Sequence, residues 1–123
     1  MNKVLVVDDS STVRQQVTAA LGPAGFEVLE AADGAQALEA LRQQPATKLV
    51  ICDVNMPNMN GLEFLEALGK LNPKPAVPVV MLTSEGRADL IEKAKKAGAR
   101  GWLVKPFKPE QLVAVARKLS TPT

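Results

Sequence analysis

Short, nearly continuous apolar runs recur along this chain of 123 residues, and they constrain its fold more than any other feature. Four such runs, rich in β-branched residues, cover residues 3–8, 48–53, 78–84 and 101–105. A fifth run, residues 26–31, alternates polar and apolar side chains, which indicates less complete burial on one face. Continuous runs of this length are typical of strands that are buried on both faces of a parallel sheet.

The segments between these runs repeat apolar residues at the spacing of one helix face. The stripes span residues 13–21, 37–41, 62–68, 90–97 and 112–119. Gly22 and Gly98 follow two of the stripes as stop signals, Asn60 precedes the third as a candidate N-cap, and Pro109 suits the first turn of the last. Because a parallel connection needs a crossover helix, this alternation predicts an α/β fold. We expect one domain, residues 1–123, with a doubly wound parallel sheet between two helix layers.

Composition excludes several kinds of chemistry. The chain has no histidine, which rules out Ser-His-Asp and Cys-His catalysis and histidine metal sites. Its single cysteine, Cys52, cannot form an internal disulfide or a zinc cluster, and its place in an apolar run predicts a buried core residue. No apolar run approaches the ~20 residues that span a bilayer, and no signal-peptide cleavage site follows the N-terminal run. We therefore expect a cytoplasmic protein without a membrane segment.

The net charge is only +2, but the charges are unevenly distributed. Residues 1–66 carry 4 basic and 9 acidic groups, whereas residues 67–123 carry 11 basic and 4 acidic groups. One interpretation is ordinary solvated helix faces. The other is a basic face that docks an acidic protein segment. Nucleic-acid binding is not expected, because aromatic and basic residues are not interleaved.

Charged and hydroxyl residues stand where the apolar runs end. The first run ends at Asp8 and Asp9, the third at Asp53, the fourth at Thr83 and Ser84, and the fifth at Lys105. In a parallel sheet these ends share one edge, which is where sites in such folds lie. Three carboxylates in one small site repel each other unless a cation binds, and Mg²⁺ prefers hard oxygen ligands of this kind.

These residue types suit phosphoryl transfer. A carboxylate can attack phosphorus and form an acyl phosphate, and catalysis of that step depends mainly on positioning and positive charge. Mg²⁺ and Lys105 would supply the charge, and a hydroxyl would detect the product. Taken singly, Asp9, Thr83 and Lys105 are consistent with turn, cap or solvated positions. Their conjunction at matching strand ends favours a functional site.

Four motifs at these strand ends resemble the receiver domain of bacterial two-component response regulators, most closely the stand-alone chemotaxis (CheY-like) type. The motifs are VLVVDDS, CDVNMPNMNG, MLTSEG and GWLVKPF, and the resemblance runs from about residue 3 to residue 119. It implies a flavodoxin-like (βα)5 three-layer sandwich with strand order 2-1-3-4-5. It also implies that Asp53 is the phosphoacceptor and that Asp8, Asp9 and Asp53 bind Mg²⁺ with the backbone carbonyl of Asn55. Lys105 would pair with the phosphoryl group.

The resemblance further implies a conformational switch. Thr83 would be the switch hydroxyl and Trp102 the switch aromatic, although Trp102 is larger than the Tyr or Phe usual at this position. The Lys105–Pro106 bond would be cis, as in the family.

By the same resemblance, a histidine kinase of the chemotaxis type would phosphorylate Asp53, and the chain would be a signalling protein rather than an enzyme. No effector domain is evident, so we expect the chain to signal by protein docking. We also expect it to be a monomer. The expected docking face is the fourth helix, fifth strand and fifth helix, with Lys93, Lys95, Lys96 and Arg100. The family suggests a flagellar-motor switch or another motility protein as the downstream partner.

Other functions remain open at this point. A flavin-binding domain shares the topology, but Asp8 and Asp9 would repel the flavin phosphate. An aspartyl-phosphate hydrolase is a second alternative, although the chain has no DxD pair. A third is a receiver-like interaction module that is never phosphorylated, and a fourth is a phosphate sink without downstream output.

Overall fold

The computed structural model describes residues 2–56, 58–71, 75–83 and 88–120. Strands and helices alternate along this part of the chain, as the apolar pattern predicts. The strands are β1 (Asn2–Val7), β2 (Phe26–Ala31), β3 (Thr47–Asp53), β4 (Val79–Thr83) and β5 (Gly101–Val104). The helices are α1 (Ser11–Leu21), α2 (Gly34–Gln43), α3 (Gly61–Gly69), α4 (Ala88–Lys96) and α5 (Pro109–Ser120). Ser84, at the end of the fourth predicted run, lies outside the described residues.

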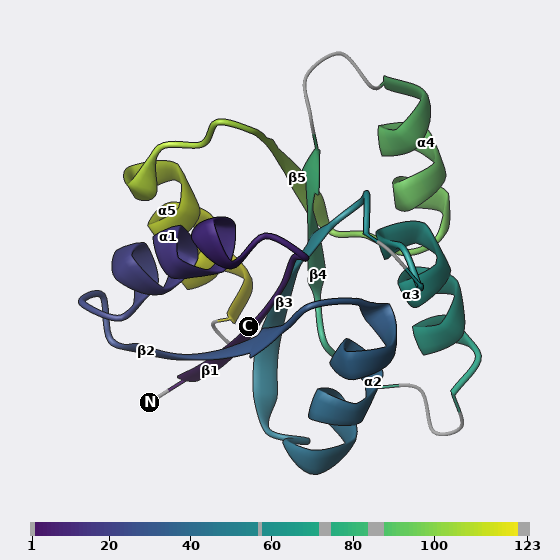
Figure 1. The fold of residues 1–123 in the computed structure, drawn as a ribbon, viewed down its shortest axis with the longest axis horizontal. Coiled ribbons are helices and arrows are strands. Elements are labelled where there is room, and N and C mark those ends of the chain that lie inside the picture. The colour runs from purple at the N-terminus through teal and green to yellow at the C-terminus, as the bar shows by residue number, and fades with distance from the viewer. Residues whose placement is uncertain (1, 57, 72–74, 84–87, 121–123) are drawn as a thin grey trace.

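The strands form one parallel sheet in the order β2-β1-β3-β4-β5, which confirms the order implied by the resemblance. Helices α1 and α5 cover one face, and α2, α3 and α4 cover the other (Figure 1). Because every strand runs in the same direction, the carboxyl ends of all the strands lie along one edge. That edge is where the site residues were predicted to meet.

The central strands are continuous hydrophobic runs because each of their two faces packs in an apolar core. Leu5, Val7 and Cys52 pack under α2, α3 and α4, whereas Val4 and Val6 pack under α1 and α5. Successive side chains of a strand point to opposite faces, so a strand covered by helices on both sides buries every residue. Cys52 is buried, as predicted, and its burial raises the pKa of the thiol.

Strand β5 departs from the prediction. Its apolar run predicted burial on both faces, but Trp102 is 40% exposed and Val104 is 42% exposed. The reason is its place at the edge of the sheet, where it pairs only with β4. In that pairing Trp102 lies beside Met81 and Val104 beside Thr83, so Trp102 and Thr83 share one face of the sheet.

The predicted helix ends are confirmed. The side chain of Asn60 accepts a hydrogen bond from the Glu63 backbone N–H at 2.9 Å, and Glu63 accepts one from the Asn60 N–H at 3.0 Å, which forms a capping box. Gly98 follows α4 with φ at +109°, a conformation that suits glycine. Pro109 is the first residue of α5. No helix in the described ranges is long and apolar enough to cross a membrane.

Gly61, the first residue of α3, packs against the end of β3 without room for a side chain. A Cβ atom at this position would overlap the backbone carbonyl oxygen of Asp53 and lie 2.7 Å from the Met81 Cε. Gly61→Ala should therefore lower the free energy of unfolding by about 1–3 kcal/mol, measured by urea denaturation. Gly69→Ala, at the other end of α3, is the control, because nothing lies within 4 Å of an added Cβ there. Equal effects of the two substitutions would contradict the close packing.

Candidate functional site

The structure brings the predicted strand-end residues together. Asp8 directly follows β1, Asp53 and Thr83 are the last residues of β3 and β4, and Lys105 directly follows β5. These strands are neighbours in the sheet, so their ends lie next to one another at the carboxyl edge. Asp8 and Lys105 are 97 residues apart in the sequence and in direct contact here.

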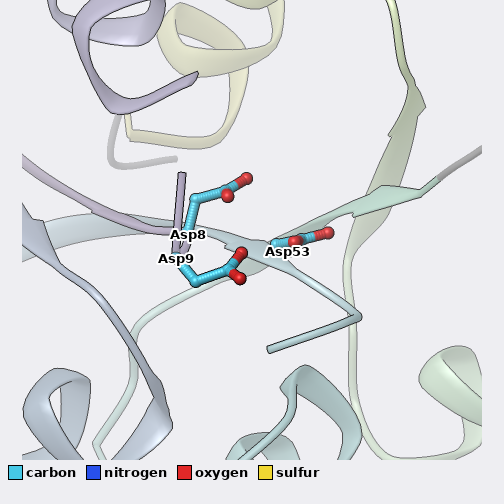
Figure 2. Close-up of side chains that lie close together, drawn as sticks. All are labelled: Asp8, Asp9 and Asp53. Carbon is cyan, nitrogen blue, oxygen red and sulfur yellow. The ribbon is translucent and has the colours of Figure 1, made fainter. Parts of the chain in front are cut away.

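Three carboxylates gather at this edge. One oxygen from each of Asp8, Asp9 and Asp53 lies within 4.8 Å of the others. Figure 2 shows the three side chains close together, with Asp8 and Asp9 directly after β1 and Asp53 at the end of β3. Asp8 and Asp53 are buried, whereas Asp9 is exposed and leaves the group open to solvent. The donors are all hard oxygen atoms, and the set fits a divalent cation such as Mg²⁺.

Lys105 places one ammonium group between the two buried carboxylates. Its Nζ lies 2.9 Å from Asp8 Oδ2 and 3.3 Å from Asp53 Oδ1. Burial favours the neutral lysine, but the hydrogen bond to Asp8 and the negative charges of both carboxylates outweigh it and raise the pKa of Lys105. The lysine is therefore charged at neutral pH and offsets part of the carboxylate repulsion.

Asp53 has the opposite balance. Its burial and the negative charge of Asp8 raise its pKa above the ordinary value, although Lys105 and a hydrogen bond from the Asn55 backbone N–H work against the shift. The ionised form of Asp53 is therefore energetically unfavourable, because one ammonium group is shared between two carboxylates. A divalent cation or another positive group at this site would relieve that cost.

Asp8 is held from several sides. The Ser10 backbone N–H donates to Asp8 Oδ1 at 2.9 Å, and the Arg14 guanidinium donates to the Asp8 carbonyl at 2.6 Å. Arg14 also forms an ion pair with Glu30 on β2, with 3.0 Å between Nε and Oε1. The sequence analysis missed Arg14, since nothing in its spacing distinguishes it from a solvated arginine on a helix.

The two predicted switch residues are placed differently. Thr83 is 2% exposed, and its buried hydroxyl has no hydrogen-bond partner in the described part of the chain. Trp102 faces solvent, and the Lys95 Nζ on α4 lies 4.4 Å from the centre of its ring, a cation–π contact that the sequence analysis did not anticipate. The Lys105–Pro106 bond is cis, as the resemblance implied.

The raised pKa of Asp53 predicts the effect of neutralising it in metal-free protein. The folded chain binds this proton more tightly than the unfolded chain, so the charge of Asp53 destabilises the fold as pH rises above 3.8 and through the folded pKa. In EDTA at pH 7, Asp53→Asn should melt at a higher temperature, by roughly 4 °C for each ~1 kcal/mol of repulsion relieved. Glu66→Gln, an exposed neutralisation on α3, should change little. A lower melting temperature for Asp53→Asn would contradict the charge balance described here.

Known proteins share both the sequence and the fold. The profile of the response regulator receiver domain matches residues 4–117. The chemotaxis protein CheY1 of Helicobacter pylori is 43% identical over 111 residues, which cover 89% of this chain and 90% of that protein. The structure of chemotaxis protein CheY4 of Vibrio cholerae is 44% identical with a TM-score of 0.88, covering 97% of this chain and 98% of the other.

A receiver domain protein from Clostridium thermocellum gives a TM-score of 0.88 at 30% identity, covering 98% of this chain and 94% of that one. The motifs, the strand order and the family profile therefore agree over most of the sequence. The chain belongs to the family of response regulator receiver domains.

Proposed function

We propose that this receiver domain is a phosphorylation-activated signalling protein of chemotaxis, with Asp53 as the phosphoacceptor. The observation that carries the proposal is the environment of Asp53. Its buried carboxylate lies 3.3 Å from the Lys105 ammonium and within 4.8 Å of oxygen atoms of Asp8 and Asp9. The similarity to proteins named for chemotaxis supports the biological setting.

Asp8, Asp9 and Asp53 would hold Mg²⁺ together with the backbone carbonyl of Asn55. The exposure of Asp9 and Asn55 leaves the group accessible to a cation from solvent. Mg²⁺, when bound, supplies positive charge that offsets the carboxylate repulsion and the charge on the transferring phosphoryl group. The remaining positive charge comes from Lys105.

In the proposed reaction, a carboxylate oxygen of Asp53 attacks the phosphorus of a phosphohistidine on a partner kinase. An O–P bond forms, the N–P bond breaks, and its electron pair stays with the imidazole of the kinase. The chain has no histidine of its own, so this donor belongs to another molecule. Lys105, already beside Asp53, holds its charge against the phosphoryl oxygens, and the chain modifies itself rather than turning over a free substrate.

Thr83 would detect the phosphoryl group. Its buried hydroxyl is at the end of β4, next to the strand that ends in Asp53, and the residues described here offer it no hydrogen-bond partner. A phosphoryl oxygen on Asp53 would accept that hydrogen bond and draw Thr83 toward it. In the sheet, Thr83 pairs with Val104, and Trp102 lies on the same face two residues before Val104. A shift of Thr83 therefore changes the space beside the Trp102 ring.

The output face would be the basic and apolar surface around β5. Trp102 and Val104 are exposed on β5, and α4 presents exposed lysines at Lys93, Lys95 and Lys96. Apolar groups rimmed by one sign of charge suit an acidic protein segment with an apolar anchor. We propose a motility partner such as a flagellar-motor switch protein, bound by a cytoplasmic monomer that works as one receiver domain.

The flavin alternative is disfavoured by the same geometry. The carboxylates of Asp8, Asp9 and Asp53 occupy the edge of the sheet where a flavin phosphate would bind, and they would repel it. A purified protein that carries a yellow chromophore would reverse this conclusion.

The phosphoacceptor role predicts a metal-dependent acyl phosphate. With labelled acetyl phosphate and Mg²⁺, the wild type should take up one phosphoryl group per chain, in a base-labile form, and none in EDTA. Asp53→Asn should take up none. Asp9→Asn should need at least about tenfold more Mg²⁺ for the same uptake, because it loses a metal donor. Stoichiometric labelling of the Asp53→Asn protein at another residue would refute the assignment of Asp53.

The switch predicts an optical signal. Trp102 is the only tryptophan and the chain has no tyrosine, so near-ultraviolet emission reports one site. Beryllofluoride with Mg²⁺ should change the intensity or wavelength of that emission, because it mimics the phosphoryl group that Thr83 detects. The change should be absent in Thr83→Ala. Constant emission from a wild type that binds the mimic, shown by fluorine NMR, would mean that Thr83 and Trp102 are not coupled.

A further inference from the structure

A second polar cluster ties the loop between β3 and α3 to the beginning of α2. Asp33, immediately before α2, is only 8% exposed, and its two carboxylate oxygens have different partners. Oδ1 accepts a hydrogen bond from the Gln36 backbone N–H at 2.9 Å, which caps the helix. Oδ2 accepts one from the Asn58 side-chain amide at 3.0 Å, across 25 residues of sequence.

The backbone strengthens this connection. The Gly34 N–H donates to the Met59 carbonyl at 3.0 Å, and the Met59 side chain lies so close that a Cβ on Gly34 would be 2.6 Å from its Cγ. Asn58 adopts a positive φ of 66°, a conformation uncommon outside glycine that asparagine tolerates. The loop is thus attached to α2 by side-chain, backbone and packing contacts.

The attached loop is the one that reaches the phosphoacceptor. It leaves β3 at Asp53, and the backbone N–H of Asn55, two residues further on, lies close enough to the Asp53 carboxylate to favour its ionised form. At its base, the Gly61 N–H donates to the Val54 carbonyl at 2.9 Å and closes the loop. The contact between Asn58 and Asp33 therefore fixes the end of this short loop near α3, while Asn55 lies at the end next to Asp53.

We propose that Asp33 and Asn58 are a positioning pair for the phosphoacceptor site, acting through the backbone of Asn55. This proposal rests on the proposed function, since it assigns the pair to the same site. Neither residue is a member of the Asp8–Asp9–Asp53 group. The pair fixes the loop so that the Asn55 backbone stays beside Asp53, with its carbonyl available to the metal. Groups that orient metal-binding residues in this way typically change metal affinity by ~10–100-fold when they are lost.

A simpler role for Asp33 would be to cap α2. A cap needs one acceptor oxygen, and serine supplies it as well as aspartate does. Serine has no second oxygen to accept from Asn58, so Asp33→Ser keeps the cap and removes the cross-loop contact. Asn58→Gly removes the same contact from the other side, and glycine retains the positive φ without strain.

The experiment is a double-mutant cycle with Mn²⁺ as the probe, its free concentration measured by electron paramagnetic resonance. Asp33→Ser and Asn58→Gly should each weaken Mn²⁺ binding about tenfold, and the double variant should be no weaker than either single variant. Melting temperatures in EDTA, recorded in parallel, report the fold separately. Gln44→Ala is the control, because Gln44 accepts a hydrogen bond from Lys3 at the other end of α2 and should leave Mn²⁺ affinity unchanged.

The outcomes separate the two proposals. Wild-type Mn²⁺ affinity in both single variants, or additive losses in the double variant, would overturn the positioning pair while leaving Asp53 as phosphoacceptor. A wild-type chain that binds no Mn²⁺ and takes up no phosphoryl group would overturn both. Lower melting temperatures with unchanged Mn²⁺ affinity would show that the Asp33–Asn58 contact serves fold stability alone and would overturn the pair.

Discussion

The contact of the Lys105 ammonium with Asp8 and Asp53 is the interaction on which the site depends. Two buried carboxylates side by side would be costly, since an unpaired buried charge destabilises a fold by several kcal/mol. The Lys105 Nζ, 2.9 Å from Asp8 Oδ2 and 3.3 Å from Asp53 Oδ1, offsets part of this cost. Its single positive charge cannot balance these two carboxylates and the nearby Asp9. The residual negative charge makes the site receptive to a cation, and burial together with the charge of Asp8 raises the pKa of Asp53.

The parallel sheet brings these site residues together although they do not lie in one continuous sequence motif. β1, β3, β4 and β5 are adjacent and run in one direction, so groups at their ends meet although they come from distant parts of the chain. The apolar cores on both faces hold the strands in place, which fixes the positions of the residues at their carboxyl ends. Gly61 allows α3 to pack directly against the end of β3, and its N–H donates to the Val54 carbonyl, which closes the loop after Asp53.

The sequence predicted the fold and the composition of the site because both depend on patterns that it displays. Apolar runs identify strands, their charged ends identify the edge, and the motifs around Asp8 and Asp53 identify the family. It did not predict that β5 leaves Trp102 exposed, because an apolar run does not distinguish an edge strand from a central one. Arg14 on the Asp8 carbonyl and Lys95 over Trp102 also escaped prediction, since such contacts depend on side-chain directions between elements.

The proposed mechanism phosphorylates one residue, Asp53, and the roles proposed for the other site residues depend on that position. The most direct measurement is borohydride trapping of the protein after reaction with acetyl phosphate and Mg²⁺, followed by peptide mass spectrometry. Hydride reduces an aspartyl phosphate to homoserine, which marks the modified position in the chain. We expect homoserine at position 53 and at no other aspartate, with none formed in EDTA. Homoserine at position 8 or 9, or a fully reacted protein with an unmodified Asp53, would contradict it.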